Sequence, residues 1–216
     1  MFPSHDHHGY SEGRIFYDGD NHALAVYNDE ADITLQVGQE EYVRVRNNTG
    51  STIFNGQAVR IAGSQGTNTT IELAIATGDL SSQAIGLATH DIGNNEFGYV
   101  TTFGMVRDLN TNDFIAGGEV YLSQVIAGGL TGVAPVAPNY KMSIGHVVRS
   151  HPSVGTVLVT PSTPKLGGGD VKSLGQAETS GVAFVSAESN GSASDRDWET
   201  VPTLGWLLTT CPMDIL

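Results

Sequence analysis

The sequence predicts an all-β protein: a short-stranded β-barrel or sandwich with an N-terminal β-hairpin region and extended terminal arms. Three observations favour this class. Only 15% of the 216 residues are charged, against roughly 25% in an ordinary soluble domain, and the chain holds 27 glycines. Short runs of β-forming residues alternate with Gly- and Asn-rich turns, as in sandwiches and barrels rather than in βαβ units. No segment keeps a helical apolar period for more than about two turns.

The first 41 residues comprise a polar arm and a hairpin region. Residues 1–13 are rich in His, Gly and Ser and cannot build a core alone. Residues 14–41 form the predicted hairpin region, in which a turn at 18–21 joins the first two strands. Its predicted strands lie at 14–17, 23–27 and 33–37.

Residues 42–163 are predicted to form the central barrel or sandwich. At its start Val43 and Val45 alternate with three polar residues, which is the period of a half-buried strand. Those polar residues, Tyr42, Arg44 and Arg46, share a face that we interpret as solvated, with contact to an acidic neighbour or a sugar as the alternative. Further strands are predicted at 58–62, 71–76, 84–88, 97–106, 119–122, 143–149 and 155–160.

Residues 164–216 are predicted to be a linker and a C-terminal extension. The glycines at 167–169 form a flexible boundary, and the few apolar residues beyond them cannot build a separate core. Left exposed, those residues would form a sticky patch, so we predict that they contact other subunits or partners. The predicted contact residues are Trp206, Leu207, Leu208, Ile215 and Leu216.

Composition limits the partners. Ten basic residues face 23 acidic ones, for a formal net charge of -13, and this excludes nucleic-acid binding driven by clustered Lys and Arg. No stretch reaches the ~18–20 apolar residues of a membrane span. The single cysteine, Cys211, rules out an intrachain disulfide framework and a Cys-based zinc cluster. The start carries no secretion-signal pattern. With a single cysteine, we expect synthesis in a reducing cytoplasm, or at least folding that does not depend on oxidation.

No constellation in the sequence indicates catalysis, and we predict that the chain is not an enzyme. It has neither a Gly-x-Ser-x-Gly elbow nor a Gly-rich phosphate loop ending in Lys-Ser or Lys-Thr. Several His and carboxylate residues could be argued as acid–base groups, but we interpret them as turn or surface residues. They are His90, Asp91, His146, His151, Glu96, Asp108 and Asp113. Residues 18–21 look like a calcium loop but lack its ligand spacing and distal Glu, so we predict a hairpin turn.

Three segments resemble a module found in virion proteins of tailed bacteriophages. They are GQEEYVRVRNNTGSTI at 38–53, IGLATHDI at 85–92 followed by GYVTTFG at 98–104, and IGHVVRSH at 144–151. The resembling proteins are tail-fibre or other appendage proteins, and the pattern is also similar to small β-barrel decoration proteins of phage capsids. The segment after Pro164 takes no part in the resemblance.

The resemblance implies a non-catalytic structural protein of the virion, acting as a homotrimer. A fibre or appendage component, most often of the tail, is the first expectation. Two alternatives stay open: a capsid decoration, cement or head-fibre protein that binds the shell, and a receptor- or glycan-binding module. The implied partners are further copies of the chain, other virion proteins and a host surface glycan or receptor. A glycan-depolymerising enzyme has little support, because no β-helical repeat or acid pair is evident.

The N-terminal arm holds one metal signal. In an extended strand His5 and His7 point to the same face. Around the threefold axis that the resemblance implies, three such pairs would offer an octahedral set of imidazoles to a divalent transition metal. The alternative is a polar arm without metal, and we predict no other cofactor.

Overall fold

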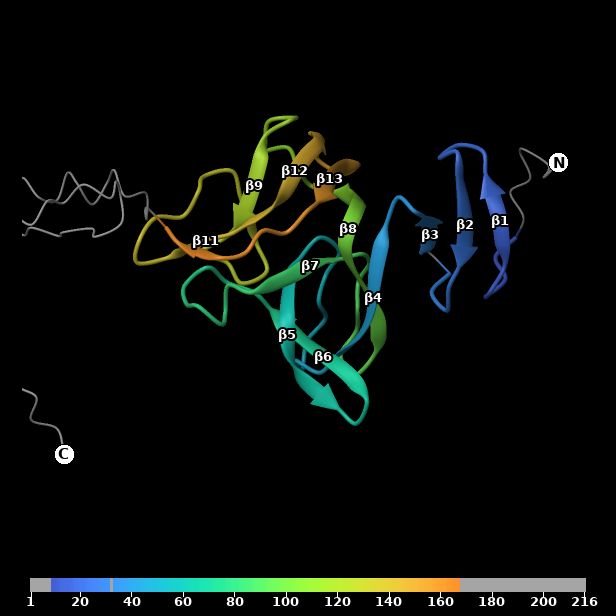
Figure 1. Cartoon of the computed structure of the whole chain (residues 1–216), viewed down its shortest axis with the longest axis horizontal. Coiled ribbons are helices and arrows are strands. Elements are labelled where there is room, and N and C mark those ends of the chain that lie inside the picture. Colours follow the sequence, from blue (N-terminus) through green and yellow to red (C-terminus); the bar gives the residue numbers. More distant parts are fainter. Residues whose placement is uncertain (1–8, 32, 168–216) are drawn as a thin grey trace, which may run out of the picture. The chain divides into compact units, whose positions relative to one another are not determined.

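The structure, a computed structural model, describes residues 9–31 and 33–167, and every regular element in them is a β-strand (Figure 1). This confirms the predicted all-β class. That part of the chain contains no helix able to cross a membrane. The strands are β1 (Ile15–Asp18), β2 (Ala23–Tyr27), β3 (Thr34–Val37), β4 (Glu41–Asn47), β5 (Ala58–Gln65), β6 (Asn68–Leu73), β7 (Ala84–Ala88), β8 (Phe97–Leu109), β9 (Glu119–Leu122), β10 (Leu130–Thr131), β11 (Tyr140–Lys141), β12 (Ser143–Arg149), β13 (Gly155–Val159) and β14 (Lys165–Leu166).

Strands β1, β2 and β3 form a separate antiparallel sheet, with β2 in the middle (Figure 1). The turn between β1 and β2 is the predicted hairpin turn, and it sets Asp18 opposite Ala23. Alternation along each strand gives the sheet two faces. On the inner face Ala25 is fully buried and Gln36 is 5% exposed, because this face lies toward the rest of the fold.

A closed ring of five strands forms the barrel. Around the ring β4 pairs with β6, β6 with β5, β5 with β7, β7 with β8, and β8 with β4. The β4–β6 pair is parallel and short, and the other four pairs are antiparallel. A closed ring leaves no free strand edges except where pairing stops. Its apolar interior is made of Val45, Ile53, Val59, Ile71, Ala88, Ile92 and Val100.

Strand β8 belongs to two parts of the fold. Its first half, up to Phe103, pairs with β4 in the ring, and its second half, from Gly104, pairs with β13. From there the sheet continues through β12 and β9 to β10. A second apolar cluster fills the space beside this extension and includes Leu87 of the ring strand β7. One long strand therefore joins the barrel to the sheet extension (Figure 1).

Two residues explain how the ring closes. Gly86, in β7, lies between β5 and β8, and a Cβ atom there would stand 2.0 Å from the Thr101 carbonyl oxygen. Asn47, at the end of β4, is fully buried, and its amide nitrogen donates to the carbonyls of Ser51 at 2.7 Å and Ile92 at 2.8 Å. Its side-chain oxygen accepts from the backbone of Thr49. This amide ties the end of β4 to the neighbouring loops, as buried polar groups require.

Most sequence-predicted strands coincide with observed ones, and one face prediction is wrong. Val43 was expected inside with Val45, yet it is 38% exposed, whereas Val45 is 1% exposed. The reason is that β6 covers the edge of β4 only at Arg46 and Asn47, so Val43 lies where the ring is open. On the opposite face, expected to be solvated, Tyr42 is half-buried beside the N-terminal sheet.

Candidate functional site

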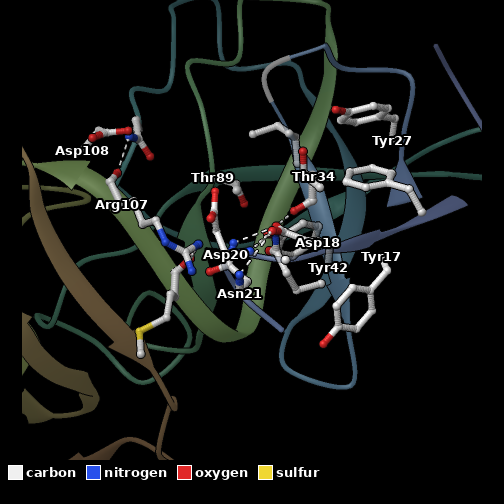
Figure 2. A pocket seen from close by; sticks show the side chains of 16 residues that line it. Tyr17, Asp18, Asp20, Asn21, Tyr27, Thr34, Tyr42, Thr89, Arg107 and Asp108 are labelled. Atoms are coloured by element: carbon white, nitrogen blue, oxygen red, sulfur yellow. Dashed lines mark hydrogen bonds between the residues drawn. The ribbon is translucent and has the colours of Figure 1, made fainter. Parts of the chain in front are cut away.

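A polar groove of about 540 Å³ lies between the N-terminal sheet and the barrel (Figure 2). One wall is the β1–β2 turn, and the other is the second half of β8. In Figure 2 the side chains of Asp18, Asp20, Asn21 and Arg107 converge at its centre. Aromatic residues line the opposite end, where the rings of Phe16 and Tyr27 lie 4.7 Å apart.

Glu40 does not line the groove, but it holds two residues that do, Arg107 and Tyr42. Its side chain is 2% exposed, and it forms an ion pair with Arg107, whose Nη1 lies 3.0 Å from Oε1. The hydroxyl of Tyr42 donates to Glu40 Oε2 at 2.6 Å. Burial, followed by this contact with the carboxylate, strongly raises the pKa of Tyr42, so the hydroxyl stays protonated and keeps donating. A buried carboxylate with these partners fixes the position of Arg107.

The β1–β2 turn is held in shape by Asp18. Its Oδ1 accepts from the backbone nitrogens of Asp20 at 2.9 Å and Asn21 at 3.2 Å, and its Oδ2 accepts from the Asn21 amide at 2.7 Å. Burial would raise the pKa of Asp18, but the hydrogen bonds from Asn21, Asp20 and Gln36 outweigh it and lower the pKa. Asp18 is therefore an ionised turn residue, and the carboxylate of Asp20 is exposed at the groove.

Two unusual groups lie at the β8 wall: Asp108 of β8 itself, and Asn55 of the loop before β5. Asp108 has a φ angle of 58°, a left-handed backbone conformation that non-glycine residues adopt at a cost. Beside it, Asn55 donates from its side chain to the carbonyl of Arg107 at 2.9 Å. Among the described residues, the Asn55 side-chain oxygen is buried and has no hydrogen-bond donor. Because this oxygen has almost no exposed surface, its missing hydrogen bond is a local cost of the fold.

The outer face of the N-terminal sheet is a second candidate surface. Ile15, Val26 and Leu35 form one cross-strand row, and Tyr17, Leu24 and Val37 form the next. We call these six side chains the outer apolar face. Four of them are strongly exposed: Ile15 at 64%, Val37 at 46%, Leu24 at 44% and Tyr17 at 40%. An uninterrupted apolar face on three strands is unusual for a surface that meets only water.

Polar contacts attach the N-terminal sheet to the barrel. Arg44 Nε and Nη2 both donate to Asp29 Oδ2, at 3.1 and 2.8 Å, and the Tyr99 hydroxyl donates to the same carboxylate. The hydrogen bond from Tyr99, then those from Arg44, lower the pKa of Asp29. Burial and the contact with Asp29 raise the pKa of Tyr99 to about 12. The Arg44 guanidinium also lies 4.0 Å from the centre of the Phe97 ring, so its partners are within the chain.

The residues weighed for acid–base chemistry have local structural contacts. His90 Nε2 accepts from the Tyr99 backbone at 3.2 Å, and His151 Nδ1 accepts from the backbone of Ser153 at 3.1 Å. The carboxylates of Asp91 and Glu96 accept from nearby backbone nitrogens, at 2.8 and 3.1 Å. The structure does not gather these residues into one site. It does place Asp108 at the groove, a role for which its turn-like sequence gave no signal.

Two predicted sites fall outside the described residues. They are the His5 and His7 metal pair, and the C-terminal contact set Trp206, Leu207, Leu208, Ile215 and Leu216. Both remain predictions. Within residues 9–31 and 33–167, no group of three or more His, Cys, Asp or Glu residues is close enough to hold a metal ion.

In comparisons with known proteins, no family model, curated protein or solved structure matches the chain. The function must therefore be argued from the two surfaces. Sequence reasoning missed both. The sequence carried only a partial signal for the outer apolar face. Residues 15–17 and 24–26 are all apolar or aromatic, so the two strands show no alternation that tells which face will be covered. The groove had no such signal, because its walls are far apart in the sequence.

Proposed function

We propose that the chain is a non-catalytic structural protein of a tailed-phage particle, a trimeric fibre or appendage component attached to the tail. The resemblance of residues 38–53, 85–92 and 144–151 to phage virion modules supports this proposal, and the all-β fold fits it. The proposed partners are further copies of the chain, other virion proteins and the host surface. The proposed mechanism is multivalent attachment, in which several identical surfaces act together.

The outer apolar face is the observation that carries the assembly part of the proposal. Its two cross-strand rows contain no charged side chain, although the whole chain has a formal net charge of -13. Copies with this charge repel one another, so a stable contact between them must bury an uncharged surface. The outer apolar face meets that requirement. Three copies around an axis would each turn this face inward and remove it from water.

Burial of this face would contribute substantially to association. Removing apolar area from water stabilises a complex by roughly 25 cal/mol per Å², and Ile15 and Leu24 are among the most exposed large apolar residues of the sheet. Tyr17 adds an aromatic ring, and aromatic residues are enriched at interfaces. The C-terminal residues Trp206 to Leu208, Ile215 and Leu216 are proposed as a further contact.

Analytical ultracentrifugation of the purified full-length chain tests the assembly. We expect a species of about three times 22.7 kDa at micromolar concentration. The double variant Leu24→Thr/Val37→Thr keeps β-forming residues but removes much of the apolar surface, and it should shift the trimer to smaller species. Ile115→Thr, at a loop residue that is 83% exposed, is the matched control and should leave the mass unchanged.

A monomeric wild type, or an unchanged trimer in the double variant, would contradict assembly through this face. Cryo-electron microscopy of the intact particle then separates the tail proposal from the capsid-decoration alternative, because it places the subunit on the tail or on the head shell. Density for this chain on the head shell alone would replace the first proposal by the second.

A further inference from the structure

We propose that the groove between the β1–β2 turn and β8 binds a neutral saccharide. This inference goes beyond the assembly role and does not depend on it, because all groove residues belong to one chain. The groove has an aromatic end and a polar end. Phe16 and Tyr27 line the aromatic end. The polar end extends from Asp20 and Arg107 at the centre of the groove to Asp108, as the labelled side chains in Figure 2 show.

This division matches the chemistry of a sugar ring. A pyranose has C–H groups on one face, and these pack favourably against the electron-rich face of an aromatic ring. Its hydroxyl groups both donate and accept hydrogen bonds. The groove offers complementary partners: carboxylate acceptors at Asp20 and Asp108, and a guanidinium donor at Arg107. Among the described residues, only Nη1 of Arg107 has a hydrogen-bonding partner, which leaves Nε and Nη2 as donors.

The negative charge of the groove favours neutral saccharides over acidic ones. The carboxylates of Asp18, Asp20 and Asp108 line the groove. Among the described residues in its lining Arg107 is the one cation, and it is already paired with buried Glu40. The groove is therefore negative, as is the whole chain. Uronic acids, sialic acids and phosphorylated sugars would be repelled. A neutral saccharide is left as the fitting class.

The polar end is held in position without a ligand. Asp18 fixes the β1–β2 turn through three hydrogen bonds, and Glu40 fixes Arg107 by an ion pair inside the fold. Asp108 is kept in a left-handed conformation at the opposite wall. Such pre-organisation lowers the entropic cost of binding a flexible, well-hydrated ligand.

The test uses the full-length protein and a printed panel of neutral oligosaccharides of glucose, galactose, mannose and N-acetylglucosamine, with polygalacturonate and sialylated glycans as the acidic arm. Hits are then measured by isothermal titration calorimetry. We expect at least one neutral saccharide to bind. Asp20→Ala and Asp108→Gly should each weaken its binding by about tenfold, the effect of one lost hydrogen bond to a charged acceptor.

Both substitutions suit the local backbone. Asp20 is an exposed turn residue, and glycine adopts the left-handed conformation of Asp108 freely. Asp113→Ala, an exposed acidic residue outside the groove lining, is the matched control and should bind like the wild type. Thermal unfolding of each variant verifies that it is folded.

Three outcomes would overturn the proposal. The first is the absence of binding to every neutral saccharide of the panel at millimolar concentration. The second is equal binding by wild type, Asp20→Ala and Asp108→Gly, which would move any saccharide site away from the groove. The third is preferential binding of the acidic arm. None of these outcomes bears on the mass of the assembly, so failure here is distinct from failure of the proposed trimer.

Discussion

The barrel and the N-terminal sheet are made of similar short strands, but the barrel covers its large apolar side chains, whereas the N-terminal sheet leaves four of its own exposed. In the ring, Val45, Ile71 and Val100 are at most 1% exposed and point into a closed interior. In the N-terminal sheet, Ile15 and Leu24 point outward. The sheet is held to the barrel by polar contacts rather than by a shared apolar core. Alternation in a strand therefore defines two faces, but only the tertiary contacts decide which one is covered.

This difference has a functional meaning. The barrel contains its own source of stability, since ring closure buries its apolar residues and pairs its strands. The N-terminal sheet, in contrast, leaves its outer apolar face exposed, because nothing in the described part of the chain covers it. We therefore expect changes in the barrel to affect folding and changes in the sheet to affect attachment and assembly. The following predictions test that division, from the largest effect to the smallest.

The largest effect is expected for Gly86→Ala in the barrel. The added Cβ would stand 2.0 Å from the backbone oxygen of Thr101, so β7 and β8 would have to separate and the ring would open. We expect a loss of at least about 3 kcal/mol in the free energy of unfolding, at the upper end of overpacking effects. Urea denaturation followed by far-UV circular dichroism measures it.

Gly38→Ala is the matched control for Gly86→Ala. Gly38 lies between β3 and β4 with a φ angle of 86°, and a Cβ atom there meets no atom within 4 Å. Only the left-handed backbone is strained, so the expected cost is about 1 kcal/mol. Equal costs for the two variants would show that ring closure is not the stricter constraint.

An intermediate effect is expected for Asn47→Ala. The substitution removes the amide that bridges Ser51 and Ile92, and it leaves the Thr49 backbone nitrogen without its acceptor. We expect the free energy of unfolding to fall by about 2 kcal/mol. Asn47→Asp should be worse, because a carboxylate oxygen would face two carbonyl oxygens. A variant Asn47→Asp as stable as wild type would contradict the assigned hydrogen bonds.

The smallest effect is expected for Asp29→Asn, at the junction between sheet and barrel. The folded state lowers the pKa of Asp29 below 3.8, so the carboxylate contributes stability above about pH 4 and loses it as pH falls through the folded pKa. Because the ion pair with Arg44 is partly exposed, we expect at most about 1 kcal/mol. The difference between wild type and Asp29→Asn should shrink toward zero on acidification.

Amide hydrogen exchange locates the Asp29 effect. Exchange in β2 and β3 should accelerate in Asp29→Asn at neutral pH, while exchange in the ring strands stays unchanged. Uniform acceleration across both regions would mean that the sheet and the barrel unfold as one unit. A difference between wild type and variant that grows as pH falls would reverse the sign argued for Asp29.

The sequence predicted the local elements well and their assembly poorly. Strands β2, β7, β9 and β12 have the predicted bounds, because alternating β-formers and Gly-rich turns are local signals. The two-residue strands β10, β11 and β14 were missed, since so short a segment has no period. The parallel pairing of β4 with β6 had no local signal either. Because it covers β4 only at Arg46 and Asn47, Val43 stays exposed.

The groove illustrates the same limit. The hairpin turn at residues 18–21 was predicted correctly, including its preference over a calcium loop. Its position opposite Arg107 and Asp108 depends on how the N-terminal sheet docks on the barrel. That docking relies on contacts such as Glu40 with Arg107, which no period or motif in the sequence announces.

The contacts between the N-terminal sheet and the barrel can form only late in synthesis. The contact of Asp29 with Tyr99 needs a residue synthesised 70 positions later, and that of Glu40 with Arg107 needs one synthesised 67 positions later. At ribosomal rates of roughly 5–20 residues per second, the N-terminal sheet is synthesised several seconds before Tyr99 and Arg107 are. During that interval both of its faces are uncovered. The N-terminal sheet is therefore made early, but its contacts with the barrel can form only after β8 has left the ribosome.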